Sequence, residues 1–116
     1  MFLSKVCEIL NAEVCCGEDK MDVEVLSACG SDFMSDVLAF VKNQAVLLTG
    51  MINPQVIRTA EMMDMKCIVF VRGKHPTPEM LSLARSCGIV VMSTALPMYS
   101  ACGELYKRGL QGGSSR

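Results

Sequence analysis

Residues 45–73 read AVLLTGMINPQVIRTAEMMDMKCIVFVRG, which predicts a strand, a helix and a second strand. The apolar runs 45–49 and 67–71 are continuous rather than alternating, as is typical of parallel strands buried on both faces. Between them, Asn53 can cap a helix whose first position is taken by Pro54, where a missing N–H group costs nothing. The stretch therefore predicts a crossover helix that joins two parallel strands.

Apolar runs and capping residues predict further elements on either side of this unit. Three more strands are expected at residues 12–16, 23–29 and 89–92. Four more helices are expected, opened by the capping hydroxyls of Ser4, Ser35, Thr77 and Thr94, the second of them running to residue 43. Strands that alternate with amphipathic helices predict a layered α/β fold, in which helices flank a mostly parallel sheet. We expect one domain over residues 1–108 and a flexible polar tail over residues 109–116.

Composition limits the kinds of partner that the chain can have. Its 116 residues suit one domain, and its formal net charge of −1 comes without a basic stripe that could neutralise several phosphates of a nucleic acid. Lys5 and Glu8 interrupt the apolar N-terminus, and no run approaches the roughly 20 apolar residues of a membrane span. We therefore expect a cytoplasmic protein that binds neither nucleic acid nor membrane.

The sequence has seven cysteines without a C-x-x-C pair, and His75 is its only histidine. Because this spacing does not resemble a metal site, we expect no metal and no cofactor. Free cysteines then serve as small hydrophobic residues in a reducing compartment. In the vicinal pair Cys15–Cys16, strand alternation should turn one thiol outward. His75 has no nucleophile or carboxylate at a telling spacing, so we do not assign it as a general base.

A first candidate site follows the run 45–49, where Thr49 and Gly50 lead to the helix start at Asn53. A loop between a parallel strand and a helix offers N–H groups to an anion, and ligands of open α/β sheets bind at this carboxyl edge. The alternative is a tight turn in which Asn53 is only a cap. No P-loop or G-x-G-x-x-G pattern decides between the two.

Two further candidates are expected near the same edge. The segment 31–36, Ser-Asp-Phe-Met-Ser-Asp, places two carboxylates and two hydroxyls at a strand-to-helix junction, either as ligands or as competing caps. The segment 72–75, Arg-Gly-Lys-His, gathers positive charge and is either an anion site or a solvated loop. The predicted ligand-binding residues are therefore Ser31, Asp32, Thr49, Gly50, Asn53, Arg72 and Gly73.

Three stretches resemble the DRTGG domain in its stand-alone form: residues 30–39 (GSDFMSDVLA), 48–58 (LTGMINPQVIR) and 68–73 (IVFVRG). The similarity covers residues 1–107. Two family signatures are replaced here, Gly-Asp-Arg by Gly50-Met51-Ile52 and Thr-Gly-Gly by Val71-Arg72-Gly73.

The resemblance implies regulation rather than catalysis. DRTGG domains are found fused to phosphotransacetylase and to CBS-containing pyrophosphatases, and they tend to self-associate. They resemble the N-terminal domain of HPr kinase/phosphorylase and, more distantly, that of the Mur ligases, which holds a uridine nucleotide. The resemblance thus implies the fold of the HPr kinase N-terminal domain. It also implies a non-catalytic regulatory or ligand-sensing domain that forms a homodimer and contacts a partner protein.

Two alternatives stay open. One is a protein that binds a nucleotide or another phosphorylated small molecule, and the other is an accessory component of a transferase or kinase system. An enzyme is not expected, because phosphoryl transfer needs a phosphate cradle, a metal-binding carboxylate and a positioned base.

Overall fold

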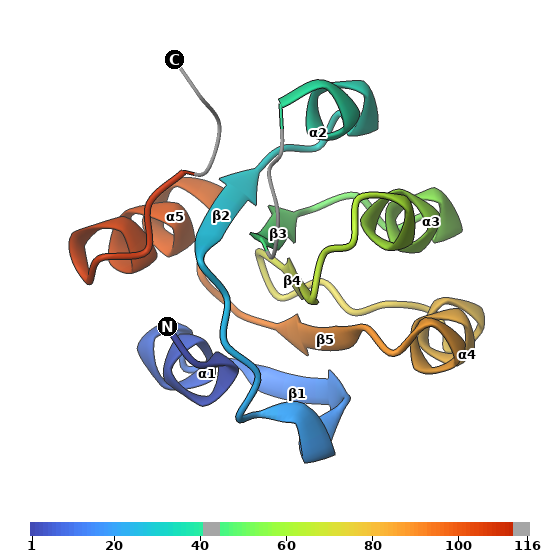
Figure 1. Cartoon of the computed structure of the whole chain (residues 1–116), viewed down its shortest axis with the longest axis horizontal. Helices are drawn as coiled ribbons and strands as arrows, with labels where there is room; N and C mark the ends of the chain where they lie inside the picture. The colour runs from blue at the N-terminus through green and yellow to red at the C-terminus, as the bar shows by residue number, and fades with distance from the viewer. Residues whose placement is uncertain (41–44, 113–116) are drawn as a thin grey trace.

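The computed structural model describes residues 1–40 and 45–112, and within them five strands form one sheet in the order β1-β5-β4-β3-β2 (Figure 1). The strands are β1 (Glu13–Cys16), β2 (Ser27–Gly30), β3 (Ala45–Thr49), β4 (Cys67–Phe70) and β5 (Val90–Ser93). Strands β2 to β5 are parallel, and β1 is antiparallel to β5. The expected mostly parallel sheet is therefore confirmed.

Helices cover both faces of the sheet (Figure 1). They are α1 (Leu3–Leu10), α2 (Met34–Phe40), α3 (Pro54–Met62), α4 (Pro78–Cys87) and α5 (Met98–Lys107), with a short 3-10 helix, η1 (Glu18–Lys20), after β1. One core cluster lies under α2, α3 and α4, and the second lies under α1 and α5. The layered α/β fold is thus confirmed as a sheet between two unequal helical layers.

Two of the predicted helix caps are confirmed by their hydrogen bonds. The Asn53 side chain accepts from the Gln55 N–H group at the start of α3, and Thr77 accepts from the Met80 N–H group at the start of α4. In both helices a proline follows the cap, as expected. These starts were predictable because cap and proline act within one turn of chain.

The other three predicted caps are wrong. Helix α1 begins at Leu3 without a side-chain cap, and Ser35 lies inside α2. The Thr94 hydroxyl instead donates to the Leu10 carbonyl oxygen at 2.8 Å, and α5 begins only at Met98, after a proline. The same hydroxyl oxygen accepts from the Leu96 N–H group at 3.2 Å, so Thr94 fixes the turn before α5 to a residue 84 positions away and does not cap the helix. The predicted end of the second helix at residues 42–43 lies outside the described residues.

The predicted strand at 23–29 is shortened to its second half. Its first residues pair with the N-terminus instead: Phe2 bridges Glu24, and the Val25 N–H group donates to the Met1 carbonyl oxygen at 2.8 Å. The N-terminal segment therefore holds residues 23–25 away from the edge of the sheet.

The predicted tail also needs a correction at its first residues. Leu110 is buried in the core under α1 and α5, and the Ala28 N–H group donates to the Gln111 carbonyl oxygen at 3.0 Å. The chain after α5 thus returns to cover part of the edge strand β2. Residues 113–116 of the tail lie outside the described residues.

Strand order follows chain order from β2 to β5, so each crossover helix packs on the same face (Figure 1). Because these strands are parallel, their last residues, Gly30, Thr49, Phe70 and Ser93, lie at one end of the sheet. We call it the carboxyl end. The loops that follow β2, β3 and β4 carry the predicted ligand-binding residues, so the fold itself gathers them there.

Candidate functional site

A carboxylate organises the carboxyl end of the sheet. Oδ1 of Asp32 accepts a hydrogen bond from the Thr49 hydroxyl at 3.1 Å and from the Gly50 N–H group at 2.7 Å. The Thr49 hydroxyl oxygen in turn accepts from the Met51 N–H group at 3.2 Å. The loop after β2 and the loop after β3 are therefore joined through one carboxylate oxygen. Its second oxygen stays available, since an ionised carboxylate can accept several hydrogen bonds.

A cation approaches the same point from the loop after β4. Nζ of Lys74 donates to the Gly50 carbonyl oxygen at 2.9 Å. A Cβ atom built on Gly50 would lie 3.6 Å from Asp32 Oδ1 and 3.7 Å from Lys74 Nζ. An acidic and a basic side chain thus meet over the Cα of one glycine. We call Asp32, Thr49, Gly50 and Lys74 the carboxyl-end cluster.

The backbone after β4 explains why Lys74 rather than Arg72 joins this cluster. Arg72 and Gly73 both have positive φ, 60° and 70°, so the chain turns tightly and brings residue 74 back over the sheet. The Arg72 and Gly73 N–H groups donate to Leu96 and Thr94 carbonyl oxygens, both at 2.8 Å. The turn is therefore fixed to the loop after β5, and the Arg72 side chain extends into solvent.

Two predicted site residues serve local structure. The Ser31 hydroxyl accepts from the Phe33 N–H group at 3.0 Å, which makes it a turn residue, and Asn53 caps α3. Their side-chain oxygens already have protein donors. For Ser31 and Asn53 these contacts agree with the structural alternatives that the sequence left open.

The N–H groups that were predicted to bind an anion after β3 are already engaged within the protein. The Gly50 and Met51 N–H groups were expected to face an anionic ligand, but each already has a protein acceptor. The Asp32 carboxylate occupies the position beside Gly50 where such an anion would lie. The cluster can therefore accept a ligand hydroxyl or amino group at Asp32, whereas a phosphate or carboxylate has to approach Lys74 and Arg72.

Three charged side chains at this end stay unpaired in the part of the chain that the structure describes. Among the described residues, Asp32, Arg72 and Lys74 take part in no ion pair. All three residues are exposed, so their charges are open to a ligand from solvent. A ligand that contacts these three side chains therefore breaks no ion pair within the described part of the chain.

One pair near the same end was missed by the sequence analysis. Nε2 of His75 lies 3.2 Å from Oε1 of Glu13, which begins β1. The two residues are 62 positions apart, and they meet only because β1 adds antiparallel to β5. Across residues 1–40 and 45–112, no group of three or more His, Cys, Asp or Glu side chains could hold a metal ion.

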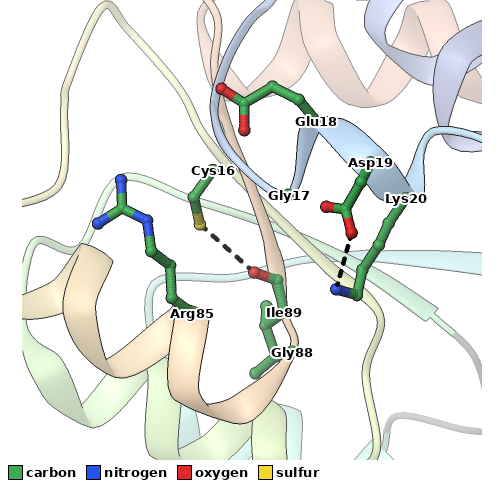
Figure 2. A pocket seen from close by; sticks show the side chains of 8 residues that line it. All are labelled: Cys16, Gly17, Glu18, Asp19, Lys20, Arg85, Gly88 and Ile89. Carbon is green, nitrogen blue, oxygen red and sulfur yellow. Dashed lines mark hydrogen bonds and ion pairs between the residues drawn. The ribbon is translucent and has the colours of Figure 1, made fainter.

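A cavity of about 280 Å³ lies at the opposite end of the sheet, where β1 ends and β5 begins (Figure 2). Its lining residues are Cys16, Gly17, Glu18, Asp19, Lys20, Arg85, Gly88 and Ile89. The lining has two acidic and two basic side chains, so its formal charges cancel. Nζ of Lys20 lies 3.8 Å from Oδ2 of Asp19 (Figure 2). The Cys16 thiol donates to the Ile89 carbonyl oxygen at 3.5 Å. No sequence motif indicates this cavity, which forms because β1 pairs with β5.

Burial disfavours the thiolate form of the cysteines. All seven are free thiols, and burial is the main cause that raises the pKa of the Cys16 thiol. Burial, with a smaller contribution from the Glu13 carboxylate, raises the pKa of Cys15 to about 11. Both members of the vicinal pair are therefore protonated at neutral pH and react slowly.

The domain is a small open α/β sheet with polar loops gathered at its carboxyl end, the edge at which ligands of such sheets bind. The model of the DRTGG domain matches residues 5–106 of this sequence. The chain belongs to the DRTGG domain family. A comparison with the curated proteins found no match.

One similar solved structure is the crystal structure of the CBS and DRTGG domains of the regulatory region of Clostridium perfringens pyrophosphatase, complexed with its activator, diadenosine tetraphosphate. The two chains are 15% identical, with a TM-score of 0.68, over 86% of this chain and 44% of that chain. This chain thus spans less than half the length of that regulatory region. At this level of identity the likeness shows a shared fold.

The lengths and compositions of the helices show whether any of them could span a membrane. Over the described residues, no helix is both long enough and apolar enough to cross a membrane.

Proposed function

We propose that this protein is a non-catalytic regulatory domain that senses a phosphorylated, nucleotide-like molecule at the carboxyl-end cluster. The observation that carries the proposal is the meeting of Asp32 and Lys74 over Gly50. A carboxylate suits sugar hydroxyls, whereas an ammonium group suits a phosphate, and both form charge-assisted hydrogen bonds. A molecule that carries both groups can satisfy both side chains at once.

The cluster favours binding over reaction. Phosphoryl transfer needs a phosphate cradle, carboxylates on a metal ion and a positioned base. Asp32 has one oxygen already engaged by Thr49 and Gly50, and those two donors hold the carboxylate in place. A fixed carboxylate with a neighbouring cation is suited to recognise a ligand without changing it.

Family and fold support a regulatory role. The similar structure is a regulatory region in complex with a nucleotide activator, which makes a nucleotide the first ligand class to test. A cytoplasmic location and a likeness to the N-terminal domain of HPr kinase/phosphorylase remain part of the proposal. A role as an accessory component of a transferase or kinase system is the alternative, and identification of a partner protein would favour it.

Signalling by such a domain would pass through a homodimer and a partner protein. Several large apolar side chains are strongly exposed, among them Leu26 at 62% and Met62 at 70%. Exposed apolar side chains that gather in a patch are typical of interaction surfaces. Sedimentation velocity over a range of protein concentrations tests the dimer, and a monomer at high micromolar concentration would contradict it.

The ligand proposal is tested by a thermal-shift screen with AMP, ADP, UMP and diadenosine tetraphosphate, followed by calorimetry on each ligand that stabilises the fold. Lys74→Ala should weaken binding, because it removes the cation beside Gly50. Lys66→Ala removes the same charge from a residue that pairs with Asp64 and serves as the matched control. Equal affinities for the two variants would refute a role for the cluster.

A further inference from the structure

Phe33 stands out among the exposed aromatic rings because of its neighbour in sequence. Four aromatic side chains are strongly exposed in the described part of the chain: Phe2, Phe33, Tyr99 and Tyr106. Phe33 is 70% exposed and directly follows Asp32, so its Cα lies about 3.8 Å from that of the cluster carboxylate residue. An apolar ring is therefore held in solvent at the rim of a polar site.

The backbone at Phe33 is fixed although its ring is exposed. Its N–H group donates to the Ser31 hydroxyl at 3.0 Å, and its carbonyl oxygen accepts from the Asp36 N–H group at 3.1 Å. Asp32 is held on the other side by Thr49 and Gly50. The backbone of Phe33 and the carboxylate of Asp32 are therefore both held in place, so a ligand that reaches Asp32 meets Phe33 without a rearrangement of the loop.

We propose that Phe33 is the platform on which the base of a nucleotide stacks, while Asp32 accepts the ribose hydroxyls and Lys74 faces the phosphate. This inference rests on the proposed function and extends it to one ligand class, the nucleoside phosphates. Nucleobases stack on exposed aromatic rings in many proteins that bind single nucleotides or single strands. Asp32 and Lys74 meet at Gly50, and Phe33 adjoins Asp32 in the chain, so the three groups suit the sugar, the phosphate and the base in turn.

The absence of tryptophan from the sequence makes a direct test available. Phe33→Trp introduces a single indole at the proposed platform, and a stacked base should quench its fluorescence. Met62→Trp is the matched control, because Met62 is also 70% exposed but lies at the C-terminal end of α3, away from the cluster. AMP and UMP carry a base, whereas ribose 5-phosphate offers the same hydroxyls and phosphate without one.

We expect AMP or UMP to quench the Phe33→Trp variant saturably, with ribose 5-phosphate and the Met62→Trp variant giving no change. Calorimetry should show that Phe33→Ala loses about tenfold in nucleotide affinity, as for the removal of one stacking contact. Phe33→Tyr should restore it, and Tyr99→Ala should have no effect.

Other results would overturn the platform and show which claim has failed. Nucleotide binding by the unaltered protein with full affinity in Phe33→Ala would leave the proposed function standing and remove Phe33 from the site. Binding of neither nucleotides nor ribose 5-phosphate at millimolar concentration would reject both proposals. If the indole fluorescence of the Phe33→Trp variant changes with protein concentration and not with nucleotide concentration, Phe33 belongs to a contact between two copies of the chain.

Discussion

The two ends of the sheet differ in how their polar groups are used. At the carboxyl end, Asp32 and Lys74 are oriented by hydrogen bonds to the loop after β3 and have no ionic partner among the described residues. At the amino end, the cavity of Figure 2 is lined by two acids and two bases that balance one another. We therefore place the proposed ligand site at the carboxyl end, where the charges are oriented and unpaired within the described chain, rather than at this cavity.

Alanine substitutions of a glycine at each end should show the largest difference in stability between the two ends. Gly17 at the amino end has a φ of 91°, and a Cβ atom there would lie 2.8 Å from Cγ2 and 3.0 Å from Cα of Val90. Gly17→Ala should therefore lower the free energy of unfolding by about 2 to 4 kcal/mol, through backbone strain and overpacking. Urea denaturation measures the change.

Gly50→Ala is the matched substitution at the carboxyl end. Its nearest contact would be 3.6 Å, an ordinary van der Waals distance, so the fold should stay within about 0.5 kcal/mol of the parent. Its methyl group would lie between Asp32 and Lys74 and should lower nucleotide affinity. Equal stability losses in both glycine variants would contradict the structural difference between the two ends.

Asp32→Ala should have the next largest effect. It leaves the Gly50 N–H group and the buried Thr49 hydroxyl without their acceptor, which should cost about 1 to 3 kcal/mol of stability. Asp32→Asn keeps an oxygen at this place and should destabilise less, although it removes the charge proposed to accept ligand hydroxyls. Urea denaturation and calorimetry together separate these effects. A normal affinity in both variants would exclude Asp32 from the site.

Substitutions of the arginines at the two ends should have smaller and different effects on nucleotide affinity. Arg72→Ala should lower the affinity for a nucleotide about fivefold, since an exposed ionic contact contributes roughly 1 kcal/mol. Arg85→Ala, at the cavity of Figure 2, should leave affinity unchanged. Both side chains are exposed, so neither variant should unfold the protein. A loss of affinity with Arg85→Ala alone would place the ligand at the amino end.

A last expected effect is confined to alkaline pH and concerns the pH dependence of stability. Folding raises the pKa of Cys15 from its ordinary 9.0 to about 11, chiefly through burial. Because the folded state disfavours the thiolate, this stability is fully present below pH 9 and is lost as the pH rises through about 11. Cys15→Ala should remove that part of the alkaline loss in urea denaturation curves recorded from pH 8 to about 11. Identical pH profiles for parent and variant would contradict the raised pKa.

The centre of the fold was predictable because its signals are local. The apolar runs at 45–49 and 67–71 and the Asn53-Pro54 start fix a strand, a helix and a strand within a single stretch of chain. Parallel strands then place the following loops at one end, which is how residues near 31, 50 and 73 could be expected together. The central strand, helix and strand were therefore expected correctly, whereas the local caps predicted at Ser4 and Ser35 were not.

Details that depend on distant contacts were not predictable. Thr94 donates to Leu10 instead of capping a helix, and Leu110 enters a core that a Gly- and Ser-rich tail did not suggest. The choice of Lys74 over Arg72 at the cluster results from an arginine with positive φ, a conformation that its sequence disfavours. Such features are set by tertiary contacts that no short stretch encodes.

The most direct measurement of the central claim follows backbone amide signals by NMR during a titration with AMP. The signals of Gly50 and Gly73 at the carboxyl end should shift with AMP concentration, whereas those of Gly17 and Gly88 at the amino end should stay in place. Shifts confined to Gly17 and Gly88 would contradict the claim that the carboxyl-end cluster is the site that senses the ligand.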